Sequence, residues 1–210
     1  MASQSFITAT QTVLPIQAVS TKTYNYGYYP LLKGDIAPVF QLHKEAFIST
    51  QHFLNLQQPL VIAFHGNLYT NEKAVTQLKN LQLQVQQAGG NLIVLNNGLA
   101  GRFRKNINQL SNLNIFTDAD NGIAELFGLY DFANPLSNWL SGVDDSSVTL
   151  PALYVIAPDR QITFSYIDYH FDFFKQASLP KEVLENLLTA VTNIERAYTY
   201  ANIRLKKLVS

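Results

Sequence analysis

The chain has 210 residues, of which 47% are hydrophobic and 14% are charged, so it suits one globular domain that can bury a core unaided. Fifteen basic residues balance fifteen acidic ones, which removes any broad electrostatic argument for nucleic acid or an anionic membrane as a partner. There is no cysteine, and this excludes disulfides, thiolate metal sites and thiol catalysis.

The first residues have neither the basic region nor the sustained apolar stretch of a secretion signal. No apolar run approaches the roughly 20 residues that a membrane helix needs. We therefore expect a soluble cytoplasmic protein.

The N-terminal region, residues 1–30, has a weak apolar pattern that Pro15 interrupts, and it ends in a tyrosine-rich stretch. We interpret it as an arm that caps the domain rather than as a binding loop, because aromatic side chains bury large areas. Residues 31–42 contain a Gly-Asp turn and then an alternating segment, which predicts an edge strand because Pro38 cannot donate inside a central ladder.

A parallel strand–helix–strand unit is predicted next. Residues 60–64 are short, apolar and bounded by a turn at Gly66, as in a strand buried on both faces. Helical spacing then continues to Gly89-Gly90, a helix stop, and residues 91–96 form a second buried strand. A helix between two strands of one sheet predicts a right-handed, parallel crossover. The helical spacing is set by Ala74, Val75, Leu78, Leu81, Val85 and Ala88.

Residues 98–112 carry Arg102, Arg104 and Lys105, which we interpret as a solvated face rather than an anion site. Residues 115–122 predict a strand end and a turn, followed by a short helix at 123–127. The carboxylates of this turn superficially resemble a calcium loop, but the later glutamate is missing, which favours turn and N-cap roles.

The remaining elements are a short helix at 134–142, an antiparallel hairpin at 150–167 and a long helix that Pro180 opens. Pro151 begins the hairpin and is a candidate cis proline. Apolar residues keep helical spacing nearly to the end of the chain, so we predict one continuous helix from about 181 to 207. Its second half is predicted to be a tail that packs on a partner or on the N-terminal arm.

Four stretches, in this order and spacing, resemble the alkyl hydroperoxide reductase/thiol-specific antioxidant (peroxiredoxin-like) family. They are Gly34–Leu42, Thr117–Gly128, Leu150–Asp159 and Asp168–Asp172, and the resemblance covers about residues 31–192. It implies an α/β fold, a thioredoxin-like three-layer α/β/α sandwich with a central mixed sheet. We assign residues 1–30 to the N-terminal arm, 31–195 to the domain and 196–210 to a C-terminal helical tail.

The resemblance also marks an ancestral active-site position. The family typically has Gly-x-Trp-Cys-Pro-x-Cys after the central strand, where this chain has Gly66-Asn-Leu-Tyr-Thr-Asn-Glu72. Leu68 stands near the tryptophan position, Tyr69 near the attacking cysteine and Glu72 near the resolving cysteine. Pro151 matches the proline that faces the active site in thioredoxin-like proteins.

A tyrosine cannot replace the attacking cysteine. Peroxide reduction of this kind needs a thiolate that becomes a sulfenic acid, whereas a phenol with a pKa of about 10 is not ionised at neutral pH. We therefore expect no thiol peroxidase activity, and a protein retained as a binding or interaction module. Its small polar pocket would be lined by His65, Tyr69, Thr70 and Pro151, although packing and an N-cap role for Thr70 are competing interpretations.

Two alternatives remain open. The first is an enzyme with non-thiol chemistry, with His65 or Tyr69 as acid or base and Glu72 nearby. The second is a structural homo-oligomer built on the N-terminal tyrosines and the C-terminal helix. We expect no cofactor, and no metal because the four histidines are scattered in sequence; the partner would be a second copy, or an unknown protein or small molecule.

Overall fold

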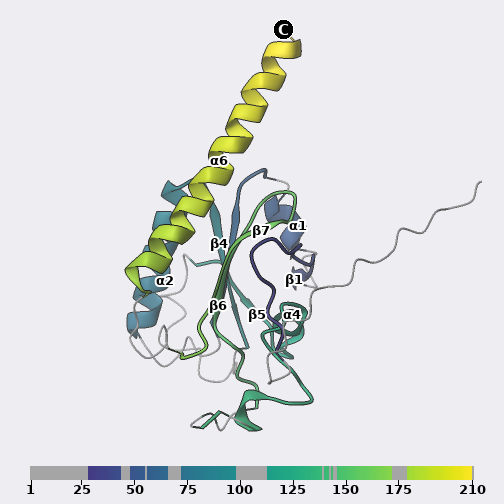
Figure 1. Ribbon diagram of the computed structural model, residues 1–210, viewed down its shortest axis with the longest axis vertical. Coiled ribbons are helices and arrows are strands. Elements are labelled where there is room, and N and C mark those ends of the chain that lie inside the picture. The colour runs from purple at the N-terminus through teal and green to yellow at the C-terminus, as the bar shows by residue number, and fades with distance from the viewer. Residues whose placement is uncertain are drawn as a thin grey trace, which may run out of the picture.

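A mixed five-stranded sheet forms the centre of the protein (Figure 1). The computed structural model describes residues 28–43, 48–54, 56–65, 72–97, 113–138, 140–141, 143, 146–171 and 179–209. The strand order is β5-β4-β3-β6-β7, with β3 parallel to β4, β4 parallel to β5, and both remaining pairs antiparallel. The strands are β3 (Leu60–Phe64), β4 (Asn91–Asn96), β5 (Ile115–Thr117), β6 (Ala152–Ile156) and β7 (Ile162–Ile167).

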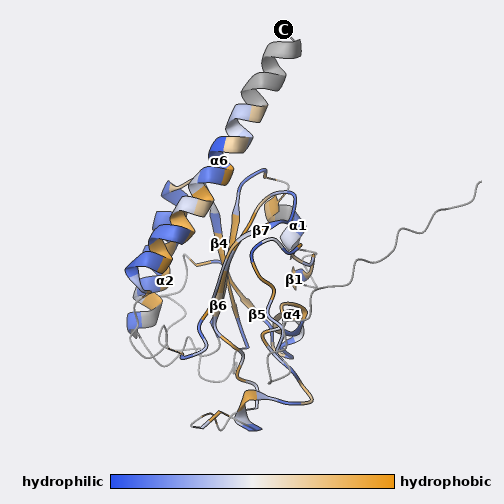
Figure 2. Cartoon of the chain, viewed as in Figure 1, coloured by the Kyte–Doolittle hydropathy of each residue, from blue (hydrophilic) through white to orange (hydrophobic). Residues whose placement is uncertain are grey.

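Helices cover both faces of the sheet, as the predicted three-layer sandwich requires. Helices α2 (Glu72–Gln87) and α6 (Lys181–Val209) lie on one face, and α1 (Thr50–Leu54) and α4 (Gly122–Leu126) on the other (Figure 1). Figure 2 shows mostly hydrophobic strands between helices that carry many hydrophilic residues.

The sheet separates two hydrophobic cores because successive residues of a strand point to opposite faces. In β3, Leu60, Ile62 and Phe64 enter the core on the α1/α4 side. Val61 and Ala63 enter the core on the α2/α6 side. A strand buried on both faces reads as a continuous apolar run, which is why its bounds could be predicted.

The prediction of an edge strand at residues 31–42 is wrong, because this segment is not a strand of the main sheet. Ile36 forms only an isolated bridge with Gln161, and the pairing ends soon after the Ala37 N–H donates to the Arg160 carbonyl at 2.9 Å. Pro38 follows and has no N–H to continue the ladder. The chain instead forms a separate two-stranded sheet of β1 (Gln41–His43) and β2 (Ile48–Ser49).

The hairpin and the C-terminal helix agree with the predictions. Strands β6 and β7 pair antiparallel around a tight turn, and α6 is continuous through the region of Ala197. The helix predicted at 134–142 is reduced to a 3-10 turn, η3 (Leu136–Asn138), in the part of that segment that the structure describes.

The described end of the N-terminal arm packs on the domain. Tyr28 is 4% exposed, and burial raises the pKa of its phenol to about 12. Tyr29 remains exposed. The other arm tyrosines lie outside the described residues.

Candidate functional site

The carboxyl ends of β3, β4 and β5 lie at one edge of the sheet because the three strands are parallel. In the chain, β3 is followed by α2, whose first residue is Glu72. The predicted site residues Gly66, Leu68, Tyr69 and Thr70 lie outside the described residues. His65 and Pro151 are the site residues whose surroundings the structure gives.

His65 is buried directly after β3, with 1% of its surface exposed. Its backbone N–H donates to the Leu95 carbonyl at 2.8 Å, and the β3–β4 register places it beside Asn96. Loss of hydration lowers the pKa of the imidazole from 6.5 to about 3, against a hydrogen bond to its own backbone that acts in the opposite direction. A neutral, enclosed imidazole does not suit general acid–base work near neutral pH.

Pro151 lies immediately before β6 and is buried. The candidate cis bond is wrong, since the Leu150–Pro151 peptide is trans. Hydrogen bonds hold the chain on both sides of this peptide: the Leu150 N–H donates to the Leu129 carbonyl and the Pro151 carbonyl accepts from the Asp168 N–H, each at 2.9 Å. A trans peptide satisfies both bonds at the strand entrance, where the missing N–H of proline costs nothing.

A set of amide contacts at the same edge of the sheet was not predicted. The Asn97 side-chain amide, directly after β4, donates to the Ser147 carbonyl. Asn121, directly before α4, donates to the same carbonyl at 2.9 Å. Together they tie the loop before β6 to the ends of β4 and β5. The sequence signal was weak because residues of this kind also occupy ordinary turns.

Asp118 has the capping role that the sequence favoured over calcium binding. It is 5% exposed, and its carboxylate accepts from the N–H groups of Ile123 at 3.0 Å and Ala124 at 2.8 Å. Desolvation raises the pKa of the carboxyl, while these hydrogen bonds oppose the rise. Among the described residues, no group of three or more His, Asp or Glu side chains could hold a metal ion.

Two pockets lie elsewhere on the described surface. One, of about 610 Å³, lies between β7 and α6. The other, of about 760 Å³, lies between β1 and β5 and is called the β1–β5 groove below. Neither of the two is lined by His65 or Pro151. The β1–β5 groove is lined by Gln41, Leu42, Ile115, Phe116, Thr117, Asp118, Ala119, Asp120, Gly122 and Ile123.

In the described part of the chain, no helix combines the length and the apolar character needed to cross a membrane.

Comparison with known proteins finds similarity in structure only. No family model matches the chain, and no curated protein matches its sequence. Peroxidoxin BcpB from Mycobacterium tuberculosis superposes with a TM-score of 0.53 and 14% identity, covering 75% of this chain and 96% of that protein. The AhpC protein of M. tuberculosis gives a TM-score of 0.50 and 13% identity, covering 76% and 92%.

A mutant of the PrxQ protein from Xylella fastidiosa gives a TM-score of 0.51 and 13% identity, covering 77% of this chain and 97% of that protein. Identities this low show a shared fold and no more. The chain therefore has the thioredoxin-like fold of the peroxiredoxins, built from a sequence without cysteine.

Proposed function

We propose that the chain is a cysteine-free peroxiredoxin-like protein without thiol peroxidase activity, retained as a binding or interaction module. The observation that carries the proposal is the combination of a peroxiredoxin fold over three quarters of the chain with the absence of any cysteine.

The chemistry of peroxide reduction explains why the missing sulfur matters. A thiolate attacks one peroxide oxygen, the O–O bond breaks, and an alcohol or water leaves as the sulfur becomes a sulfenic acid. A second thiol then attacks that sulfur, forming a disulfide and releasing water. Tyr69, near the attacking position, offers a phenol that is protonated at neutral pH and has no equivalent oxidation and recycling steps.

The described groups at this edge of the sheet do not favour acid–base catalysis. Asn97 and Asn121 use their side-chain amides to hold the Ser147 carbonyl, and amide groups are neutral near pH 7. His65 is enclosed with a pKa of about 3. The alternative with His65 as a proton carrier therefore receives no support from its environment.

The proposal is tested by steady-state turnover of hydrogen peroxide and an organic hydroperoxide, with dithiothreitol or thioredoxin and its reductase as the reductant. We expect rates equal to those of a heat-treated sample of the same preparation. Thiol-dependent turnover above that control, in proportion to protein concentration, would overturn the claim of inactivity.

A further inference from the structure

Helix α6 turns a run of short, uncharged side chains toward β7, and these side chains leave space for the pocket of about 610 Å³ between the two elements. This pocket is called the β7–α6 groove below. The run recurs at spacings of three and four residues, which places it on one face of the helix. It consists of Asn186, Thr189, Ala190, Asn193 and Ala197. The longer side chains of Lys181 and Glu185 form an ion pair with each other at 3.5 Å and do not line the groove.

An aromatic ring gives the groove an apolar surface. Phe164 of β7 lies on the face of the sheet that α2 and α6 cover, where it packs against the core and is only partly buried. Ile194 of α6 also lines the groove. An aromatic side chain offers a flat apolar face on which another planar ring can stack. The volume of the groove is within the ordinary range of roughly 300–1,000 Å³ for ligand pockets.

The groove also holds polar groups that the protein itself does not use. In the described part of the chain, the ammonium of Lys33 and the side-chain amides of Asn186 and Asn193 have no hydrogen-bond or ion-pair partner. All three residues are exposed, so water hydrates them in the free protein. The hydroxyls of Thr163 and Thr189 donate to backbone carbonyls at 3.2 and 2.8 Å, which leaves their oxygens free to accept.

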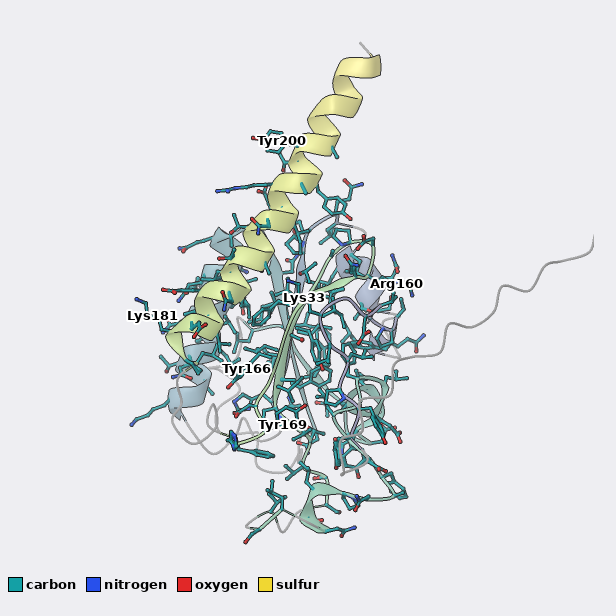
Figure 3. All side chains as sticks on the ribbon, viewed as in Figure 1. Lys33, Arg160, Tyr166, Tyr169, Lys181 and Tyr200 are labelled. Atoms are coloured by element: carbon teal, nitrogen blue, oxygen red, sulfur yellow. The ribbon has the colours of Figure 1, made fainter. Side chains whose placement is uncertain are left out.

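Lys33 is the one charged side chain among the described residues that line the groove, and Figure 3 shows it between the strands and α6. Its backbone is fixed on β7, because the Lys33 N–H donates to the Ser165 hydroxyl at 3.0 Å and the next N–H, of Gly34, donates to the Ile162 carbonyl at 2.8 Å. The ammonium therefore starts from an anchored position, and its charge makes the groove favourable for an anion.

The nearest acidic group does not cancel this preference. Asp159 lies close enough to Tyr198 to raise the pKa of that phenol, together with the larger effect of desolvation, so Tyr198 is neutral at the groove. The Asp159 carboxylate accepts from the Gln161 N–H at 3.0 Å within its own turn and does not line the groove.

The lining selects one class of ligand. Cations and metal ions find neither a carboxylate nor a histidine among the described lining residues, and a polyphosphate needs more than one positive charge. A planar ring system with a single carboxylate or phosphate ester suits all the groups present. The ammonium of Lys33 donates to the anionic oxygens, the ring stacks on Phe164, and the two asparagine amides bond to polar groups on the ring.

We infer that the β7–α6 groove binds a small planar molecule that carries one anionic group, with Lys33 at the anion and Phe164 against the ring. The inference rests on the proposed role as a binding module and gives that role a site. The site is separate from the ancestral active-site position, since neither His65 nor Pro151 lines the groove. Because the groove is open and its one cation is exposed, we expect a dissociation constant on the order of 100 μM.

Nuclear magnetic resonance titrations of the ¹⁵N-labelled full chain test the inference with three probes: 2-naphthoate, 2-naphthyl phosphate and the neutral 2-naphthamide. We expect the two acids to shift the backbone amides of Phe164 and Ser165 and the side-chain amides of Asn186 and Asn193. The acid that binds more tightly identifies the anionic group. The neutral probe should bind about fivefold more weakly than that acid, because it forms no ion pair with Lys33.

Two variants separate the charge from the space. Lys33→Gln should weaken binding of the preferred acid about fivefold and leave 2-naphthamide unchanged, whereas its matched control Lys181→Gln changes neither. Thr189→Trp fills the groove and should abolish binding of all three probes. Its control is Thr199→Trp, on the same helix but outside the groove. Circular dichroism checks that every variant is folded.

The inference is overturned if no probe binds at concentrations up to about 5 mM, or if the shifts centre on the β1–β5 groove instead. Equal affinities for the acids and the neutral probe would also overturn it, as would unchanged binding by Thr189→Trp. Each of these results leaves the absence of peroxidase activity standing, because turnover is measured separately. Peroxide turnover, in contrast, would overturn the proposed function without altering the binding data.

Discussion

At the scale of one residue, burial of His65 keeps its imidazole neutral and away from solvent. Its pKa is about 3 in the folded chain, against 6.5 ordinarily. Between about pH 6.5 and pH 3 the imidazole binds a proton in the unfolded chain but not in the folded chain. The free energy of unfolding therefore keeps its full value above about pH 6.5 and decreases as the pH drops toward 3.

The pH dependence of unfolding tests this environment. Between pH 7.5 and 5.5 the titration of one such histidine lowers the free energy of unfolding by about 1 kcal/mol. We expect urea unfolding of His65→Gln to lose that much less stability over this interval than the original chain. Equal slopes for the two proteins would show that His65 is not enclosed.

The hydroxyl of Tyr154 is a second buried polar group. Tyr154 has no exposed surface, and its hydroxyl has no hydrogen-bond partner within the described chain. The ring packs against Phe127 and Phe64, with centroids 5.0 and 6.0 Å away. Burial raises the pKa of the phenol.

Tyr154→Phe removes an unsatisfied hydroxyl and keeps the ring contacts, so we expect a free energy of unfolding that is unchanged or about 1 kcal/mol higher. Tyr154→Ala should lose about 3–5 kcal/mol, because it also removes the ring. Urea unfolding measures both. A loss of more than about 1 kcal/mol for the phenylalanine variant would mean that the hydroxyl makes a stabilising contact.

At the scale of elements, the join between the N-terminal segment and α4 depends on one glycine. Gly128 has φ +68°, and a Cβ there would lie 2.0 Å from the Tyr29 carbonyl oxygen. Next to it, the Leu31 N–H donates to the Phe127 carbonyl at 3.0 Å. The backbone of residues 29–31 therefore approaches the end of α4 more closely than any side chain would allow.

We expect Gly128→Ala to destabilise the fold by about 3 kcal/mol or more, since backbone must move as well as adopt a strained φ. Gly34→Ala is the matched control: it has φ +102° but no atom within 4 Å of an added Cβ, so it should cost only the backbone strain of about 1 kcal/mol. Chemical denaturation compares the two, and equal losses would contradict the close approach.

The elements that the sequence predicted best are those whose local signals agree. Residues 60–64 and 91–96 form the predicted strands to the residue, since each is an apolar run bounded by turn residues. The predicted edge strand failed because alternation at residues 31–42 could not reveal that β1 pairs with β2 instead. Register and partner choice depend on residues far away in the sequence.

The candidate site was less predictable than the fold for the same reason. The residue after a buried strand can face solvent or the core, and only tertiary packing, which no local pattern reveals, decides that His65 is enclosed. The contacts of Asn97 and Asn121 with Ser147 span 50 and 26 residues. No local pattern specifies such contacts, whereas the absence of cysteine needed no structure at all.

At the scale of the whole molecule, the chain has the fold of the peroxiredoxins but lacks the cysteine on which their chemistry depends. The chain keeps the layers of a peroxiredoxin and has no sulfur nucleophile. We therefore expect this protein to act through its surfaces.

The central claim is tested most directly by a single-turnover reaction with protein in excess over hydrogen peroxide, because this reaction does not depend on supplying the right reductant. We predict that peroxide disappears no faster than with heat-treated protein, and that intact mass spectrometry finds no new oxygen adduct beyond oxidation of the single methionine. Rapid, stoichiometric loss of peroxide in the native sample alone would contradict the account.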